Sequence, residues 1–165
     1  PPHLHPHPPP TPQKPQKPIN QPIMLAHEKL AAYQHAIEFV AWSQPIIEEI
    51  PGRVSARDQL DRASTSVPLN IAEGNGKFSV KDRARYLQTA FGSALECAAA
   101  LDVLLARKMI KENDVQEGKR IIEKTIAPIM GLLNHFGYRI DEDQAQYGIN
   151  PQIFEGDGEE DEEGE

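Results

Sequence analysis

Apolar residues recur with a helical period in four segments between residues 23 and 140. The first segment runs from about Leu25 to Ile50, where Pro51-Gly52 ends it. Pro45 should kink or divide this helix, because proline has no backbone N–H to donate. The expected apolar stripe consists of Leu30, Tyr33, Ile37, Val40, Ile47 and Ile50.

The second and third segments flank a glycine-containing turn. Ser55 is the expected N-cap of the second helix, which closes between Gly74 and Gly76 and which Pro68 should interrupt. Ser79 is the expected N-cap of the third helix. The apolar positions of that helix alternate by four and three, which is typical of a helix packed against others. They are Leu87, Phe91, Ala94, Ala98, Leu101 and Leu105.

The fourth segment repeats this alternation. Asn113 followed by Gln116 resembles a capping box at its start, and Gly137 is a plausible C-cap. Pro128 predicts another kink. The alternating positions are Gly118, Ile122, Thr125, Ile129, Leu132 and Phe136.

Four helices with short connections and no strand pattern predict an all-α fold, an antiparallel up-down-up-down four-helix bundle over residues 23–140. Residues 1–22 contain ten prolines and alternating histidines, and we expect a disordered Pro/His-rich arm. Residues 141–165 should form an acidic disordered tail. Small residues on the middle helices leave little apolar area per chain, which favours a homo-oligomer.

The net charge of −8 belongs to the acidic tail. Two of the 17 basic residues precede residue 23, and eleven of the 25 acidic residues follow residue 140, which leaves fifteen basic and fourteen acidic residues between them. An anionic partner is therefore not excluded. Cys97 is the only cysteine, so an internal disulfide is impossible, and we expect a buried thiol in a reducing compartment. No apolar run approaches the roughly 20 residues of a membrane span, which predicts a soluble cytoplasmic protein without a membrane partner.

Polar residues interrupt the apolar faces of the second and third helices. Asn70 and Glu73 lie three apart, as do Ser93 and Glu96, so each pair shares a helix face. We expect these four residues to form a structural polar network between the helices, together with Arg62 and Ser66.

A carboxylate pair made of Glu73 and Glu96 is the alternative, because facing carboxylates could hold a metal or transfer protons. The chain has no Glu-x-x-His, no HExxH motif, no paired cysteines and no phosphate-binding glycine loop. We therefore expect no metal site, no cofactor and no enzymatic activity.

Basic residues gather around the turn between the second and third helices, where the helix dipole disfavours them. Repeated around a ring, they would form a basic rim able to hold phosphates, so they are the candidate nucleic-acid-binding residues: Lys77, Lys81, Arg83 and Arg85. In an antiparallel bundle the acidic tail emerges at the same end. We expect the tail to compete with phosphates, so that removing residues 141–165 strengthens RNA or DNA binding.

Several of these residues also form a recognisable pattern. The run comprises Gln59-Leu60, Arg62-Ala63, Ser66-Val67-Pro68, Asn70-Ile71-Ala72-Glu73-Gly74, Ala90, Gly92-Ser93 and Glu96. It resembles the signature of the four-helix-bundle family first noticed as proteins encoded within 23S rRNA intervening sequences. The resemblance spans about Leu30 to Gly137. A related branch contains the accessory variability proteins of diversity-generating retroelements, which form ring-like pentamers and act with a reverse transcriptase and its template RNA.

The resemblance implies a fold and a ring assembly more than an activity. The preferred interpretation is a non-enzymatic oligomeric helical scaffold, a homopentamer by analogy, that binds RNA, DNA or a nucleic-acid enzyme such as a reverse transcriptase. The alternative is a protein–protein interaction module that recruits partners through its tails, with no role for nucleic acid. An enzyme that uses Glu73 and Glu96 is the third hypothesis.

Overall fold

The computed structural model describes residues 24–138, so the predicted arm and acidic tail lie outside the described residues. Within this range all regular structure is helical, which confirms the all-α prediction. A short 3-10 helix, η1 (Ala26–Lys29), precedes four α-helices. These are α1 (Ala31–Glu49), α2 (Ser55–Asn75), α3 (Val80–Ala106) and α4 (Glu112–His135).

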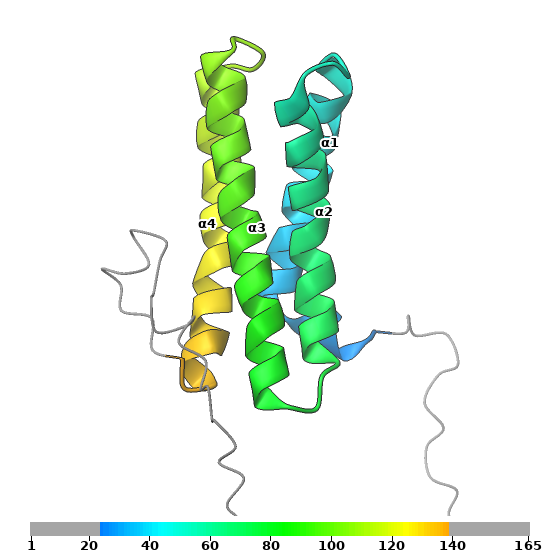
Figure 1. The fold of residues 1–165 in the computed structure, drawn as a ribbon, viewed down its shortest axis with the longest axis vertical. Coiled ribbons are helices and arrows are strands. Elements are labelled where there is room, and N and C mark those ends of the chain that lie inside the picture. Colours follow the sequence, from blue (N-terminus) through cyan, green and yellow to red (C-terminus); the bar gives the residue numbers. More distant parts are fainter. Residues whose placement is uncertain (1–23, 139–165) are drawn as a thin grey trace, which may run out of the picture.

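The four α-helices lie side by side, and consecutive helices run in opposite directions (Figure 1). α1 contacts α2 and α4, and α3 contacts the same two helices, so the four enclose one core. The α2–α3 loop, the beginning of α1 and the end of α4 lie at one end of the molecule (Figure 1). We call this the α2–α3 end.

The first helical segment is divided at Leu30 rather than at Pro45. η1 precedes Leu30 and α1 follows it. The predicted apolar stripe of α1 is partly wrong, because Ile37 is 43% exposed. Alanines take the positions that face the core, since small side chains let the neighbouring helices approach closely. The buried stripe of α1 consists of Ala32, Ala36, Phe39, Ser43 and Ile47.

The three internal prolines do not interrupt their helices. α1, α2 and α4 each continue through their proline, so Pro45 does not divide α1, and the prediction that Pro68 would interrupt α2 is wrong. A proline removes one intrahelical hydrogen bond, and packing of the helix against its neighbours outweighs that loss. Pro68 is itself buried in the interior.

The start of α3 is capped as predicted, and the start of α2 is not. The Ser79 hydroxyl accepts a hydrogen bond from the Asp82 N–H over 3.1 Å. Ser55 is instead the first helical residue of α2, after the N-cap Val54. Val54 is buried, so burial of an apolar side chain and not a polar cap fixes the entry into α2.

The ends of α4 also differ in how well the sequence predicts them. The predicted capping box at Asn113 is wrong, because the N-cap of α4 is Lys111, two residues earlier. The Lys111 N–H donates to the Asp114 carboxylate over 3.1 Å, which satisfies one free donor of the first turn. At the other end Gly137 has a φ of +90°, the left-handed conformation typical of glycine just after a helix.

Two glycines mark places where helices approach closely. A Cβ on Gly74 would lie 2.9 Å from the Tyr86 Cβ and 3.3 Å from the Arg83 carbonyl oxygen, so this glycine lets α2 and α3 meet at the α2–α3 end. A Cβ on Gly118 would lie 2.5 Å from the Trp42 ring and 2.6 Å from Leu101. The second glycine therefore brings α4 against both α1 and α3.

Among the described helices, α3 is long and apolar enough to cross a membrane by length and composition, contrary to the expectation from the sequence. This is weak evidence for a span, because the core helix of a soluble protein passes the same test. The buried apolar residues of α3 belong to the core that it shares with the other helices.

Candidate nucleic-acid interface

Three of the six residues predicted for the polar network meet between α2 and α3. The hydroxyl oxygens of Ser66 and Ser93 lie 2.9 Å apart. The Asn70 amide donates to the Ser66 hydroxyl over 3.0 Å and to the Ser66 carbonyl over 2.8 Å. Ser66, Asn70 and Ser93 thus satisfy one another, and we call them the serine cluster.

Two further residues of the predicted network lie closer to the start of α2. With the Gln59 amide oriented to suit both neighbours, its nitrogen donates to Glu96 over 2.8 Å and its oxygen accepts from Arg62 over 3.1 Å. Arg62 and Glu96 are therefore bridged by Gln59, at the exposed edge between α2 and α3.

Glu73, the last of the six, lies outside both groups. Its carboxylate accepts a hydrogen bond over 3.2 Å from Lys77, which lies in the loop just after α2. Hydrogen bonds from the Tyr86 hydroxyl and from Lys77 lower the pKa of Glu73 below its ordinary value, and the bond to Glu73 raises the pKa of Lys77. The prediction that Glu73 joins the polar network is wrong.

The antiparallel register of α2 and α3 explains this separation. Ser66 and Glu73 are seven residues apart on α2, and their partners Ser93 and Tyr86 are seven residues apart on α3. Both contacts therefore belong to one antiparallel alignment. A spacing of three shows that Asn70 and Glu73 share a face, but it does not determine which turn of α3 lies opposite.

The same register separates the two carboxylates of the enzyme hypothesis. Glu96 contacts Gln59, which precedes Glu73 by fourteen residues, or about 21 Å along a helix axis. Glu73 and Glu96 therefore do not form a pair. Within residues 24–138, no group of three or more histidines, cysteines or acidic residues could hold a metal ion.

Two of the four candidate basic residues are held in the local structure. The Lys77 ammonium binds Glu73 and lies 4.7 Å from the centre of the Tyr86 ring, a cation–π contact. The Arg83 guanidinium donates from Nε to the Lys77 carbonyl over 2.6 Å and so ties the loop to the start of α3. These two residues build the turn.

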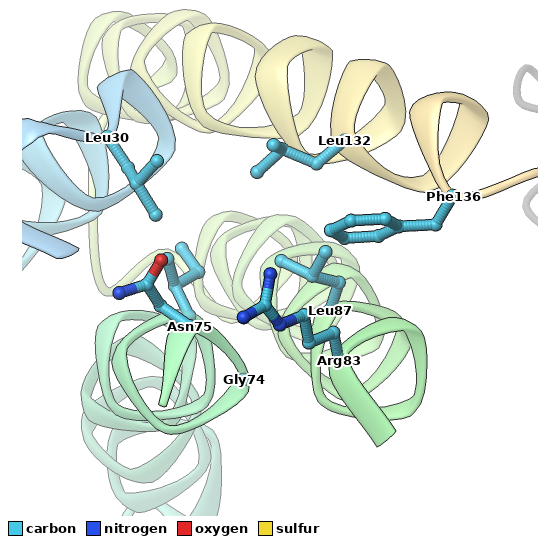
Figure 2. Close-up of a pocket in the computed structure, with 8 residues that line it drawn as sticks. Leu30, Gly74, Asn75, Arg83, Leu87, Leu132 and Phe136 are labelled. Carbon is cyan, nitrogen blue, oxygen red and sulfur yellow. The ribbon is translucent and has the colours of Figure 1, made fainter. Parts of the chain in front are cut away.

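Arg83 also lines a small cavity among the four helices at the α2–α3 end. Figure 2 shows the guanidinium beside Asn75, with Leu132 and Phe136 of α4 facing it. The cavity is about 40 Å³, enough for a few water molecules. Its walls are mostly apolar, so it is part of the packing at this end of the core.

Lys81 and Arg85 differ from the other two candidates. Both are exposed, and among the described residues neither forms an ion pair. They lie four apart on α3 and therefore share a face. Arg85 also lines a surface hollow with Lys77, Asp82, Tyr86 and Thr89.

Some basic side chains near the opposite end are paired with acids. Lys119 binds Asp102 over 2.6 Å, and Arg57 binds Asp58 over 2.9 Å. Arg57 also donates to the Ile47 carbonyl over 2.9 Å at the end of α1. Lys81 and Arg85 differ from these paired residues, because two cations without an ion pair among the described residues lie one turn apart at the start of α3.

Phe78 is a feature of the α2–α3 loop that helical periodicity does not predict. Its side chain is fully exposed, at 101%. It lies between the end of α2 and the Ser79 cap, outside the apolar period of either helix. A large aromatic residue in a polar turn, out of register with both neighbouring helices, is the signal that could have identified it.

The family of the chain is decided by a match that spans most of the helices. Residues 28–131 match the family model described as 23S rRNA-intervening sequence protein. The chain belongs to this family. No curated protein matches the chain.

In this member of the 23S rRNA-intervening sequence protein family, the matched range contains both the serine cluster and the α2–α3 loop. The residues that carried the resemblance lie on α2 and α3, where they join the two helices. Between the two halves of that pattern lie Phe78, Lys81 and Arg85. All three are exposed and do not belong to the core.

Cys97 of this family member is buried on α3 with no exposed surface. Burial, together with the negative charge of Glu96, raises the pKa of the Cys97 thiol to about 12. A thiolate is the reactive form of cysteine, so this side chain serves packing and not chemistry.

Proposed function

We propose that the chain is the subunit of a non-enzymatic, ring-like homo-oligomer of up-down-up-down four-helix bundles, and that it binds RNA or DNA at its α2–α3 end. A pentamer is the proposed assembly, by analogy with the accessory variability proteins that the sequence resembles. A nucleic-acid enzyme such as a reverse transcriptase is the proposed protein partner. The proposed location is the cytoplasm.

The observation that carries the proposal is the pair of exposed and unpaired cations at the start of α3. Lys81 lies in the first turn, where the positive end of the helix dipole disfavours a cation, and Arg85 follows one turn later. Helix stability therefore does not explain these charges. Binding of phosphate groups would explain them, because each phosphate neutralised by a cation releases bound counterions.

A shallow groove between α2 and α3 supports the oligomer. Ala56, Ala99, Ala100 and Val103 line it together with three polar residues, and Val103 is 42% exposed. A second subunit packed there would bury this area. In a ring, the two free cations of each subunit would repeat around one rim and strengthen the attraction for a phosphate backbone.

The acidic residues after position 140 would act on the same rim. The last described residue, Tyr138, follows α4 at the α2–α3 end (Figure 1). Eleven acids beyond residue 140 are thus attached near Lys81 and Arg85. We propose that they compete with phosphates, so that a chain ending at residue 140 binds RNA more tightly at low salt than the full chain does.

Two measurements on the full chain test the proposed function. Sedimentation equilibrium should give the mass of a closed oligomer, five times 18.4 kDa for a pentamer. Gel shift with RNA and DNA at low salt should detect binding that weakens steeply as salt rises. A monomer, or the absence of any shift at low salt, would contradict the proposal, and the second result would favour recruitment of protein partners through the tails.

A further inference from the structure

The most exposed large apolar side chain of the described structure is Phe78. Leu69 follows at 61%, and no other large apolar residue described exceeds 58%. An exposed phenylalanine side chain does not stabilise the fold, because its contribution to stability comes from removal of the ring from water. Its full exposure leaves the ring available for a contact outside this chain.

Phe78 lies in the loop two residues before α3, and two exposed cations on the first turns of α3 follow it. Lys81 lies three residues after it, and Arg85 lies four residues further, about 6 Å along the helix axis. Arg85 and Thr89, four residues apart on α3, line a hollow together with the acid Asp82. We call Phe78, Lys81 and Arg85 the α3 strip: one free aromatic ring followed by two free cations.

The residues around the α3 strip keep it accessible. Arg83 holds the loop through the Lys77 carbonyl, and Ser79 caps α3 through Asp82. The turn that carries Phe78 is thus anchored on both sides, while the ring itself contacts nothing in the core. The order of groups matches one strand of nucleic acid, in which a base projects from a chain of regularly spaced phosphates.

We propose that the α3 strip binds single-stranded nucleic acid, with an unpaired base stacked on Phe78 and neighbouring phosphates on Lys81 and Arg85. This inference rests on the proposed nucleic-acid function and defines the form of nucleic acid that is bound. Aromatic side chains stack on bases of any sequence, so the strip selects strandedness and not sequence.

A duplex fits the α3 strip less well than a single strand does. Bases in a duplex are stacked on one another, so only the phosphate contacts of Lys81 and Arg85 would remain. Contact with the same end of a second copy is also disfavoured, because it would bring the free cations of both copies together. A single strand satisfies all three side chains of the strip.

Fluorescence anisotropy of the full chain with a labelled single-stranded RNA, and with a duplex of the same length, tests the inference. We expect tighter binding of the single strand. The substitution Phe78→Ala should weaken single-strand binding about tenfold or more and leave duplex binding unchanged, whereas Phe78→Trp should preserve both. Met109→Ala, at an exposed apolar residue of the opposite end, should change neither.

Four results would overturn the inference. If Phe78→Ala binds the single strand as tightly as the wild type does, no base stacks on Phe78. Loss of the oligomer in Phe78→Ala, seen by sedimentation, would assign Phe78 to a contact between copies. Equal binding of single strand and duplex would leave the proposed function standing without this inference, whereas absence of binding to either would contradict both. Thermal unfolding should be the same for all variants, since both residues are exposed.

Discussion

The hydroxyl oxygens of Ser66 and Ser93 lie 2.9 Å apart and connect α2 to α3 inside the bundle. Asn70 donates to the Ser66 hydroxyl as well, so each polar group of the serine cluster has a partner. A polar contact at one depth of an apolar interface favours one register over its neighbours, because any shift would leave buried polar groups unpaired. This register places the α2–α3 loop.

The substitution Ser66→Ala should destabilise the fold by about 1–2 kcal/mol, because it leaves the buried Ser93 hydroxyl without this partner. The double substitution of Ser66 and Ser93 to alanine should cost less than the sum of the two single substitutions, since both partners are then removed together. Urea unfolding of the four proteins measures this coupling. Additive costs would show that the two hydroxyls do not interact.

The two glycines Gly118 and Gly92 should respond to alanine in opposite directions. Gly118→Ala forces a methyl group against Trp42 and Leu101 and should destabilise the fold by about 1–3 kcal/mol. Gly92→Ala adds a methyl group to an open helix position and should stabilise by up to about 1 kcal/mol. Thermal and urea unfolding compare the pair, and a stabilised Gly118→Ala protein would contradict the close packing of α4.

Lys108 has a φ of 59°, a left-handed backbone conformation that lysine rarely adopts. It follows the end of α3, where glycine is the usual residue. Lys108→Gly should therefore raise the free energy of unfolding by about 0.5–1 kcal/mol. Lys108→Ala is the matched control and should give no such gain, because alanine keeps the Cβ. Equal stabilities of the two variants would mean that backbone conformation is not the cause.

Cys97 should resist thiol reagents in the folded protein. Its pKa is raised from 9.0 to about 12, so the thiol keeps its proton at pH 8, and no part of the side chain is exposed. Labelling with iodoacetamide at pH 8 should be slow in buffer and fast in urea. A raised folded pKa stabilises the fold below pH 9, and this contribution should be lost as the pH rises from 9 towards 12. Rapid labelling of the folded protein would contradict the buried position.

Helix periodicity was enough to predict four helices and the all-α class, because each helix must bury one apolar face. Ser79 was also predictable, since its hydroxyl acts on a backbone group only three residues away. The predicted N-caps Ser55 and Asn113 were wrong. Burial of the Val54 side chain fixes the start of α2, and the Asp114 carboxylate accepts a hydrogen bond at the start of α4. The predicted and the observed N-caps are close neighbours in sequence, and only the packing of the helices decides between them.

The candidate site was predictable in position but not in detail. The sequence located the basic turn, yet it could not show that Lys77 pairs with Glu73 while Lys81 stays free, because both lie near acids in the chain. The register between α2 and α3 decides which acid meets which base, and it depends on contacts far apart in sequence. The exposed ring of Phe78 could not be predicted from apolar periodicity, because a loop residue belongs to no helical period.

The central claim is that Lys81 and Arg85 bind phosphate groups, and the salt dependence of RNA binding tests it most directly. The full chain should be compared with the double variant Lys81→Glu/Arg85→Glu and with the control Arg53→Glu/Lys124→Glu, which makes the same charge change at exposed residues elsewhere. Loss of two phosphate contacts should reduce the slope of log K against log salt by about 1.4 and weaken binding at low salt, while the control stays close to the wild type. Equal slopes and equal affinities for the two double variants would contradict the claim.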